Sequence, residues 1–245
     1  MSKLTLYGIW LSGPTYKAGL ALSLMGQPFA YKHVDLRAGA HKQPEYLAIN
    51  RFGQVPALVD GDLKLCQSGS ILLYLADKFG AFIPQDPSER AECLSWLFWQ
   101  MGAAPYLGGG FGHFYAYAPW KMEYPINRYT MEVKRQLDVL DQNLADRRFV
   151  AGDDYTIADM AIWPWYGVLT TGGVYSGEGY DAAEFLDAQS YRNVVRWTEE
   201  IAARPAVRRG RMVNRISGPL EGQLRERHAA GDFETRTQDR LEAAN

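Results

Sequence analysis

Residues 51–69 read RFGQVPALVDGDLKLCQSG, and this stretch decides the fold of the N-terminal part of the chain. Residues 57–59 and 63–65 are predicted to form a β-hairpin, because the Asp60-Gly61 pair between them supplies the positive φ that a tight turn requires. Ser68 then has the position of a cap for a helix that runs to Phe79 and stops at Gly80.

The residues before this stretch alternate between strand-like and helix-like runs. Residues 4–7 are predicted as a strand, 16–25 as a helix, 29–35 as a second strand and 43–49 as a short helix. With the hairpin and its helix, the order becomes βαβαββα. Two prolines interrupt regular structure in Pro84-Gln85-Asp86-Pro87, so we expect this unit to end there.

Long helical periods follow the proline pair. One predicted helix starts at Ser88, another spans residues 125–144, and Thr156-Ile157-Ala158-Asp159 has the spacing of an N-capping box. The fold class is therefore α/β plus all-α, with a thioredoxin-like N-terminal domain and a helical-bundle C-terminal domain. We expect domains at 1–83 and 88–216 and a polar tail at 217–245 that is surface-bound or disordered.

Composition excludes several classes of protein. The 245 residues carry 26 Lys+Arg against 28 Asp+Glu, so no net basic field favours nucleic acid or an anionic membrane. The two cysteines, Cys66 and Cys93, have no CxxC or metal-ligand spacing, and the four histidines have none either. Without a signal sequence or a long apolar run, we expect a soluble cytoplasmic protein with no metal.

Three features of the first domain are candidates for binding and chemistry. Val55-Pro56 is a candidate cis peptide whose Val55 backbone can pair with an extended peptide, although an ordinary turn proline is the alternative. Gln67-Ser68-Gly69 opens a helix and forms an anion site, although capping alone would explain Ser68. Ser12, at the junction of the first strand and first helix, points toward the same edge of the sheet.

The chain resembles the cytosolic glutathione S-transferases over residues 4–215. The most specific matches are residues 53–58 with residues 67–75, and Trp96-Leu97-Phe98-Trp99-Gln100 with Ile162-Trp163-Pro164-Trp165. The second of these two blocks looks most like the bacterial disulfide-reducing and stress-associated members, and the chain resembles a serine-type member of that group. The resemblance implies a homodimer with glutathione as co-substrate.

The resemblance also implies roles for individual residues. Ser12 would face the glutathione sulfur as the catalytic hydroxyl, with Thr15 in reserve and Tyr7 as a rival donor. The implied glutathione-binding residues are Val55 at the cysteinyl backbone, Gln67 and Ser68 at the γ-glutamyl end, His41 or Lys42 at the glycine carboxylate, and the neighbouring Gln54 and Pro56.

Residues of both domains, most of them aromatic, are candidates for an electrophile pocket. The predicted lining is Trp10, Leu11, Phe111, His113, Tyr115 and Tyr166, with domain packing as the alternative. The glycine-rich run 108–112 does not fit a nucleotide-binding loop and is predicted to be a loop or a helix break.

Three functions remain open at this point. The first is transfer of glutathione to a small hydrophobic or aromatic electrophile, and the second is glutathione-dependent cleavage of a disulfide or thioether. The third is a non-catalytic interaction module, which would not need the set Ser12, Val55-Pro56 and Gln67-Ser68. Since Ser12-Gly13-Pro14-Thr15 has oxygen where a thioredoxin Cys-Gly-Pro-Cys has sulfur, any redox step must use the thiol of bound glutathione.

Overall fold

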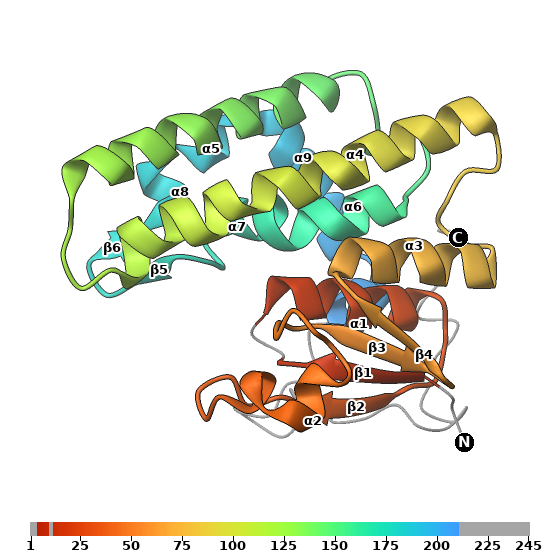
Figure 1. Ribbon diagram of the computed structural model, residues 1–245. Coiled ribbons are helices and arrows are strands. Elements are labelled where there is room, and N and C mark those ends of the chain that lie inside the picture. Colours follow the sequence, from red (N-terminus) through yellow and green to blue (C-terminus); the bar gives the residue numbers. More distant parts are fainter. Residues whose placement is uncertain (1–3, 10–11, 211–245) are drawn as a thin grey trace. The chain divides into compact units, whose positions relative to one another are not determined.

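The structure is a computed structural model and describes residues 4–9 and 12–210 (Figure 1). The chain forms two compact units. The first contains the described residues up to Ala81 together with Ala202–Gly210, and the second is Phe82–Ile201. The predicted tail at 217–245 lies outside the described residues.

A four-stranded sheet forms the centre of the first unit. Its strands are β1 (Leu4–Gly8), β2 (Ala30–His33), β3 (Ala57–Asp60) and β4 (Leu63–Cys66), in the order β2-β1-β3-β4. The β1 and β2 strands are parallel, and the other neighbours are antiparallel. Gly61 has φ +61° in the turn between β3 and β4, which confirms the predicted turn chemistry.

Helices cover both faces of this sheet (Figure 1). On one face, α1 (Gly13–Leu24) packs against α3 (Ser68–Phe79), and both contact the sheet. On the other face lie a 3₁₀ turn (Ala40–Lys42) and α2 (Pro44–Leu47). The predicted βαβαββα order is confirmed.

A helix near the end of the described chain, α10 (Pro205–Gly210), packs against α1 in the first unit. The Tyr16 hydroxyl on α1 donates to the carbonyl of Val207 over 3.3 Å. The sequence pattern predicts residues up to 216 as part of the helical domain. Its boundary differs from the structure here because polarity patterns along the chain do not reveal which unit a returning helix joins.

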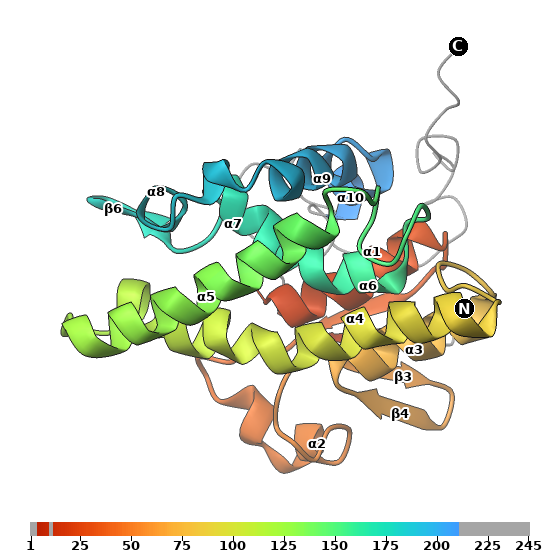
Figure 2. The ribbon, with the colours of Figure 1, turned by 90° about the horizontal axis from the view of Figure 1, so that it is seen from above.

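The second unit is helical, as predicted, and Figures 1 and 2 show α4 and α5 side by side within it. Asp86 caps α4 by accepting from the N–H groups of Ser88 and Glu89, so the helix begins at Pro87, one residue before the predicted start. The elements of the unit are α4 (Pro87–Pro105), a π-helical segment (Tyr106–Tyr117), α5 (Glu123–Asn143), α6 (Ile157–Ile162), a second π-helical segment (Trp163–Gly167), α7 (Val168–Thr170), β5 (Ser176–Gly177), β6 (Tyr180–Asp181), α8 (Ala182–Phe185), a 3₁₀ turn (Ala188–Ser190) and α9 (Arg192–Ala202).

The glycine-rich run is helical, not a loop or a break as predicted. It belongs to the π-helical segment that continues α4. A Cβ on Gly110 would overlap the ring of Tyr129, and one on Gly112 would overlap the ring of Tyr175. Two of these glycines therefore let aromatic rings lie directly on the helix backbone, which is a tertiary requirement that local propensity does not show.

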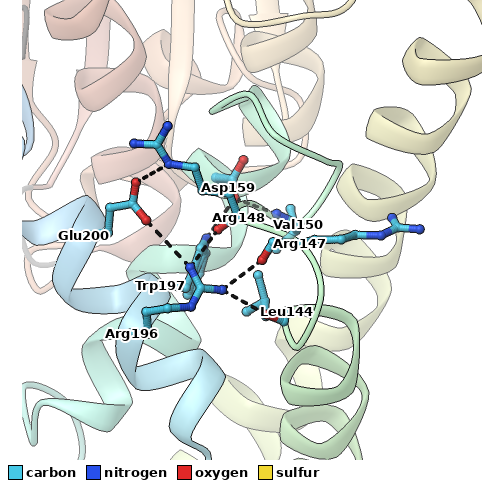
Figure 3. Close-up of polar contacts among 8 residues, drawn as sticks. All are labelled: Leu144, Arg147, Arg148, Val150, Asp159, Arg196, Trp197 and Glu200. Atoms are coloured by element: carbon cyan, nitrogen blue, oxygen red, sulfur yellow. Dashed lines mark hydrogen bonds and ion pairs between the residues drawn. The ribbon is translucent and has the colours of Figure 1, made fainter.

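The predicted capping box is present at the start of α6. Thr156 accepts from the N–H of Ala158, and the buried carboxylate of Asp159 accepts from the N–H and hydroxyl of Thr156. Asp159 also accepts from the N–H of Val150 and the indole N–H of Trp197 on α9 (Figure 3). The motif is structural, and it ties three segments of the helical unit together.

The neighbouring surface of α9 holds the end of α5 through a guanidinium group (Figure 3). Arg196 donates from Nη2 to the carbonyls of Leu144, over 2.9 Å, and Arg147, over 2.8 Å. These carbonyls follow the last helical residue of α5 and have no acceptor role inside the helix.

Within residues 4–9 and 12–210, no helix has the length and apolar run needed to cross a membrane.

Candidate functional site

Three loops leave the first unit's sheet at the same edge. Strand register pairs Tyr7 of β1 with Ala57 of β3, and Ala57 with Cys66 of β4. The residues that follow β1, precede β3 and follow β4 are therefore neighbours at that edge. The β1–α1 loop with Ser12, the segment before Ala57 and the segment after Cys66 converge there, as predicted from the sequence.

Ser12 is the N-cap of α1. Its hydroxyl oxygen accepts from the N–H of Thr15 over 3.4 Å, and its backbone is extended, as at a usual cap. A hydroxyl that accepts through a lone pair keeps its own proton for donation. Ser12 can therefore cap the helix and donate a hydrogen bond outward at the same time.

Thr15 lies inside the unit, where it is fully buried. A Cβ on Gly8 would overlap its side chain, and its hydroxyl accepts from the N–H of Ile9 over 3.4 Å. Thr15 thus connects the start of the β1–α1 loop to helix α1 through a hydrogen bond on the buried side. This placement suits a structural residue better than one that faces a ligand.

Tyr7, the rival donor, belongs to the cluster on the α2 face of the sheet. Its ring meets the ring of Tyr46 edge-on at 6.3 Å, and the ammonium group of Lys32 lies 5.3 Å from its centroid. Its packing explains why a tyrosine stands on this strand.

The Val55–Pro56 peptide bond is cis, which confirms the sequence-based candidate. Within the described part of the chain, neither the N–H nor the carbonyl of Val55 makes a hydrogen bond. Gln54 is exposed and Pro56 is buried. The loop therefore offers one residue's backbone donor and acceptor to an extended ligand.

The start of α3 differs by one residue from the prediction. Gln67, not Ser68, is the N-cap, and it has φ +69°, in the left-handed range that a side chain rarely adopts. Ser68 is the first helical residue and is buried. The N–H groups of Ser68 and Gly69 have no acceptor among the described residues, so they remain available to an anion.

The basic residues proposed for the far end of the ligand lie against the same loop. The ammonium group of Lys42 donates to the carbonyl of Gly53 over 3.0 Å. The carbonyl of His41 also approaches Gly53, and the imidazole Nδ1 of His41 is buried without a hydrogen-bond partner in the described residues. The Lys42 side chain and the His41 backbone thus both lie against Gly53, three residues before Pro56.

Tyr46 and Asn50 contact the same loop and are not among the site residues predicted from the sequence. The Tyr46 hydroxyl and the Asn50 amide both donate to the carbonyl of Gln54, over 2.7 and 2.6 Å. Burial raises the pKa of Tyr46 to about 12, so the hydroxyl keeps its proton at neutral pH. An asparagine at the end of a short helix and just before a glycine turn was the available signal, because Asn often bonds nearby backbone.

The predicted aromatic pocket is corrected at two positions. Tyr166 is fully buried and donates to Gln136 over 2.6 Å, and Phe111 is fully buried between other rings. Both are core residues of the helical unit because their neighbours there enclose them. Tyr115 stacks on Phe111 and donates to the carbonyl of Asp181, His113 is exposed, and Trp10 and Leu11 lie outside the described residues.

The cysteines lie apart from the Ser12 loop in the sequence and are held as thiols. Burial raises the pKa of both Cys66, on β4, and Cys93, on α4. Among the described residues, no group of three or more His, Cys, Asp or Glu side chains could hold a metal ion.

Family models match both units of the chain. Residues 2–77 match the description "Glutathione S-transferase, N-terminal domain", and residues 123–200 match "Glutathione S-transferase, C-terminal domain". The chain is also 56% identical over 225 residues to the disulfide-bond oxidoreductase YghU of Escherichia coli, covering 90% of this chain and 76% of that protein.

Two solved structures are similar over most of their length. A crystal structure of glutathione transferase YghU from Streptococcus pneumoniae, complexed with glutathione, has 48% identity and a TM-score of 0.82, covering 86% of this chain and 82% of that one. A glutathione transferase from Pseudomonas putida, with one glutathione disulfide bound per subunit, has 32% identity and a TM-score of 0.78, covering 88% and 92%. On these matches, the chain belongs to the glutathione S-transferase family.

Proposed function

We propose that this protein binds and ionises glutathione in its first unit and uses the thiolate to reduce disulfides. The observation that carries the proposal is the hydroxyl of Ser12, which caps α1 through its lone pair and keeps its proton for an outside acceptor. The free backbone of Val55 and the open N–H groups of α3 lie at the same edge of the sheet.

The Ser12 hydroxyl is sufficient in magnitude to activate a thiol. A thiol of pKa about 8.5 needs a shift of roughly 1.5 units, or about 2 kcal/mol, to be half ionised near neutrality. One hydrogen bond to a charged group contributes roughly 1.5–3 kcal/mol. The N-terminus of α1 behind Ser12 adds a favourable dipole for the same negative charge.

The surrounding groups match the parts of a glutathione molecule. Val55 pairs with the cysteinyl backbone, as an added strand pairs with a sheet edge. The start of α3, with Gln67 and Ser68, receives the γ-glutamyl carboxylate. Lys42, which follows His41 in the chain and contacts the carbonyl of Gly53, attracts the glycine carboxylate.

Reduction then proceeds by two thiol–disulfide exchanges. The bound thiolate attacks one sulfur of a disulfide, forms a mixed disulfide with it and expels the other sulfur as a thiolate, which takes up a proton. A second glutathione thiolate attacks the glutathione sulfur of the mixed disulfide, which yields glutathione disulfide and a second free thiol. Two glutathione molecules supply both electrons, so no cysteine of the chain is needed.

The choice of a disulfide as the substrate rests on the relatives. The Escherichia coli relative is named a disulfide-bond oxidoreductase, and the Pseudomonas putida structure holds glutathione disulfide. Transfer of glutathione to a small hydrophobic electrophile is the second candidate, because the Streptococcus pneumoniae relative is described as a glutathione transferase. The homodimer implied by the family resemblance stays a prediction, which sedimentation equilibrium would test.

A direct comparison of two substrates tests the proposal. Reduction of bis(2-hydroxyethyl) disulfide would be followed through glutathione disulfide release, and conjugation of an aryl halide through its absorbance, both with the purified chain and with Ser12→Ala. We expect disulfide reduction to be the faster reaction and to depend on Ser12. Faster conjugation would favour the transferase candidate, and neither reaction despite glutathione binding would favour a non-catalytic module.

A further inference from the structure

Two buried polar side chains wrap the loop that carries the cis Val55–Pro56 bond. Asn50 is 1% exposed, and its amide nitrogen donates to the carbonyl of Gln54 over 2.6 Å and to that of Pro56 over 3.5 Å. Its amide oxygen accepts from the N–H of Phe52 over 3.0 Å. One side chain thus holds the loop on both sides of Val55.

Tyr46 holds the same loop from α2. Its hydroxyl donates to the carbonyl of Gln54 over 2.7 Å, so this carbonyl accepts two hydrogen bonds from buried side chains. The Tyr46 ring is buried in a cluster with Val34 and Ala57, against which the side chain of Val55 also packs. The hydroxyl is therefore fixed relative to the sheet and not only to the loop.

The backbone of Gly53, two residues before Val55, is also occupied at both its donor and its acceptor. The N–H of Gly53 donates to the carbonyl of Asn50 over 2.9 Å, and the carbonyl of Gly53 accepts from Lys42. Within the described residues, the backbone of Val55 is left without a partner while the carbonyls of Gly53, Gln54 and Pro56 all have one.

From this pattern we infer that Tyr46 and Asn50 form a positioning pair, which holds the Val55 backbone in the orientation that receives the peptide ligand. The inference rests on the proposed function, because it takes glutathione as that ligand. Neither side chain touches the ligand in this arrangement. Both act through the carbonyl of Gln54, the residue immediately before Val55.

The expected consequence is a loss of affinity without a loss of chemistry. A loop that samples other conformations binds with its intrinsic affinity multiplied by the fraction in the competent state. Removal of one of the two hydrogen bonds to Gln54 should raise the Kd for glutathione about threefold to tenfold, the range of one neutral hydrogen bond. Ionisation of the bound thiol depends on Ser12, so its pKa should not move.

The first test uses Tyr46→Phe, which removes only the hydroxyl. Glutathione binding is measured by calorimetry, and kcat at saturating glutathione and the pH dependence of thiolate absorbance are measured beside it. The matched control is Tyr74→Phe, whose hydroxyl on α3 donates to Asp60 in the same unit over 2.6 Å. We expect a raised Kd only in Tyr46→Phe, with kcat and thiol pKa as in the wild type.

A Tyr46→Phe variant with reduced thermal stability but wild-type glutathione affinity would overturn the inference, since the hydroxyl would then serve the core alone. A binding readout also keeps this inference separate from the proposed function. If the wild type binds glutathione but reduces no disulfide, the function fails and the positioning pair stands. If the wild type binds no glutathione, both are overturned.

Asn50→Asp provides a second, independent variant. The substitution keeps the oxygen that accepts from Phe52 and replaces the nitrogen that donates to Gln54. Burial raises the pKa of such a carboxyl, and only its protonated form can donate. We expect the ratio of variant to wild-type Kd to approach one at low pH and to rise with pH; a ratio near one at every pH would overturn the assignment of Asn50.

Discussion

The indole N–H of Trp197 donates to Oδ1 of Asp159 over 2.8 Å, and the same oxygen accepts from the N–H of Val150 over 3.0 Å (Figure 3). One carboxylate oxygen thus joins α9 to the segment that precedes α6. The other oxygen closes the capping box with Thr156. Removal of this side chain would leave several buried donors without an acceptor at once.

Burial raises the pKa of Asp159 from 3.8 to about 6, although four donors surround it. The folded state therefore binds this proton more tightly than the unfolded state does. The stabilising contribution is complete below about pH 4 and is lost as the pH rises to about 6, by about 3 kcal/mol. Urea unfolding of the wild type and Asp159→Asn across pH 4–7 checks this; the wild-type advantage in unfolding free energy should fall with pH, and a rising advantage would contradict it.

Ser12→Ala should raise the pKa of bound glutathione by at least ~1 unit, or about 1.4 kcal/mol, and leave its affinity near the wild-type value. Thr15→Val is the matched control, since it keeps the shape that packs on Gly8 and removes the acceptor for the Ile9 N–H. It should lower stability by about 1 kcal/mol and leave the thiol pKa unchanged. Thiolate absorbance against pH measures both. A shift confined to Thr15→Val would reverse the roles, and no shift in either would move the assignment to Tyr7 or to backbone amides.

Substitution of Gln67 or Ser68 by alanine should raise the KM for glutathione at least tenfold, because hydrogen bonds to a charged group contribute roughly 1.5–3 kcal/mol each. Ser70→Ala is the control: it removes an exposed hydroxyl from the same helical turn and leaves every backbone N–H in place. Steady-state kinetics with glutathione as the varied substrate decides the point. Unchanged KM values in the Gln67 and Ser68 variants would exclude these two side chains from the anion site.

Gly110→Ala should destabilise the protein by roughly 1–3 kcal/mol, because the new methyl group would overlap the ring of Tyr129 on α5. Gly109→Ala in the same π-helical segment has no atom within 4 Å of its new Cβ and should be neutral or stabilising by up to about 1 kcal/mol. Chemical denaturation of the two variants gives the comparison. Equal stabilities would show that Tyr129 moves aside without penalty.

Local chemistry accounts for the parts of the fold that were predictable from the sequence. The Asp60-Gly61 turn, the capping box of Thr156 and the proline at Val55–Pro56 each act within a few residues, so their patterns are visible in the chain. The two-residue strands β5 and β6 were not predicted, because such short strands show no alternation. Helix α10 was assigned to the other unit because only tertiary contacts reveal where it packs.

The candidate site divides in the same way. Ser12 and Ser68 mark helix starts and could be found from the chain, although Gln67 takes the cap of α3 because its backbone turns there with positive φ. Tyr46 and Asn50 could not be predicted as site residues, because their shared partner, the carbonyl of Gln54, comes near them only when the loop is folded. Phe111 and Tyr166 were misassigned to a pocket because aromatic composition does not distinguish a lining residue from a core residue.

Oxygen at both Ser12 and Thr15 has a consequence for peroxide tolerance. A serine or threonine cannot be oxidised to a sulfenic or sulfinic acid, and burial keeps Cys66 and Cys93 protonated and slow to react. In the proposed function glutathione is the working thiol, so the activated sulfur would belong to a molecule that leaves at the end of each turnover. Peroxide damage at that sulfur would depart with the product, and a fresh supply of glutathione would restore the catalyst without repair of the protein.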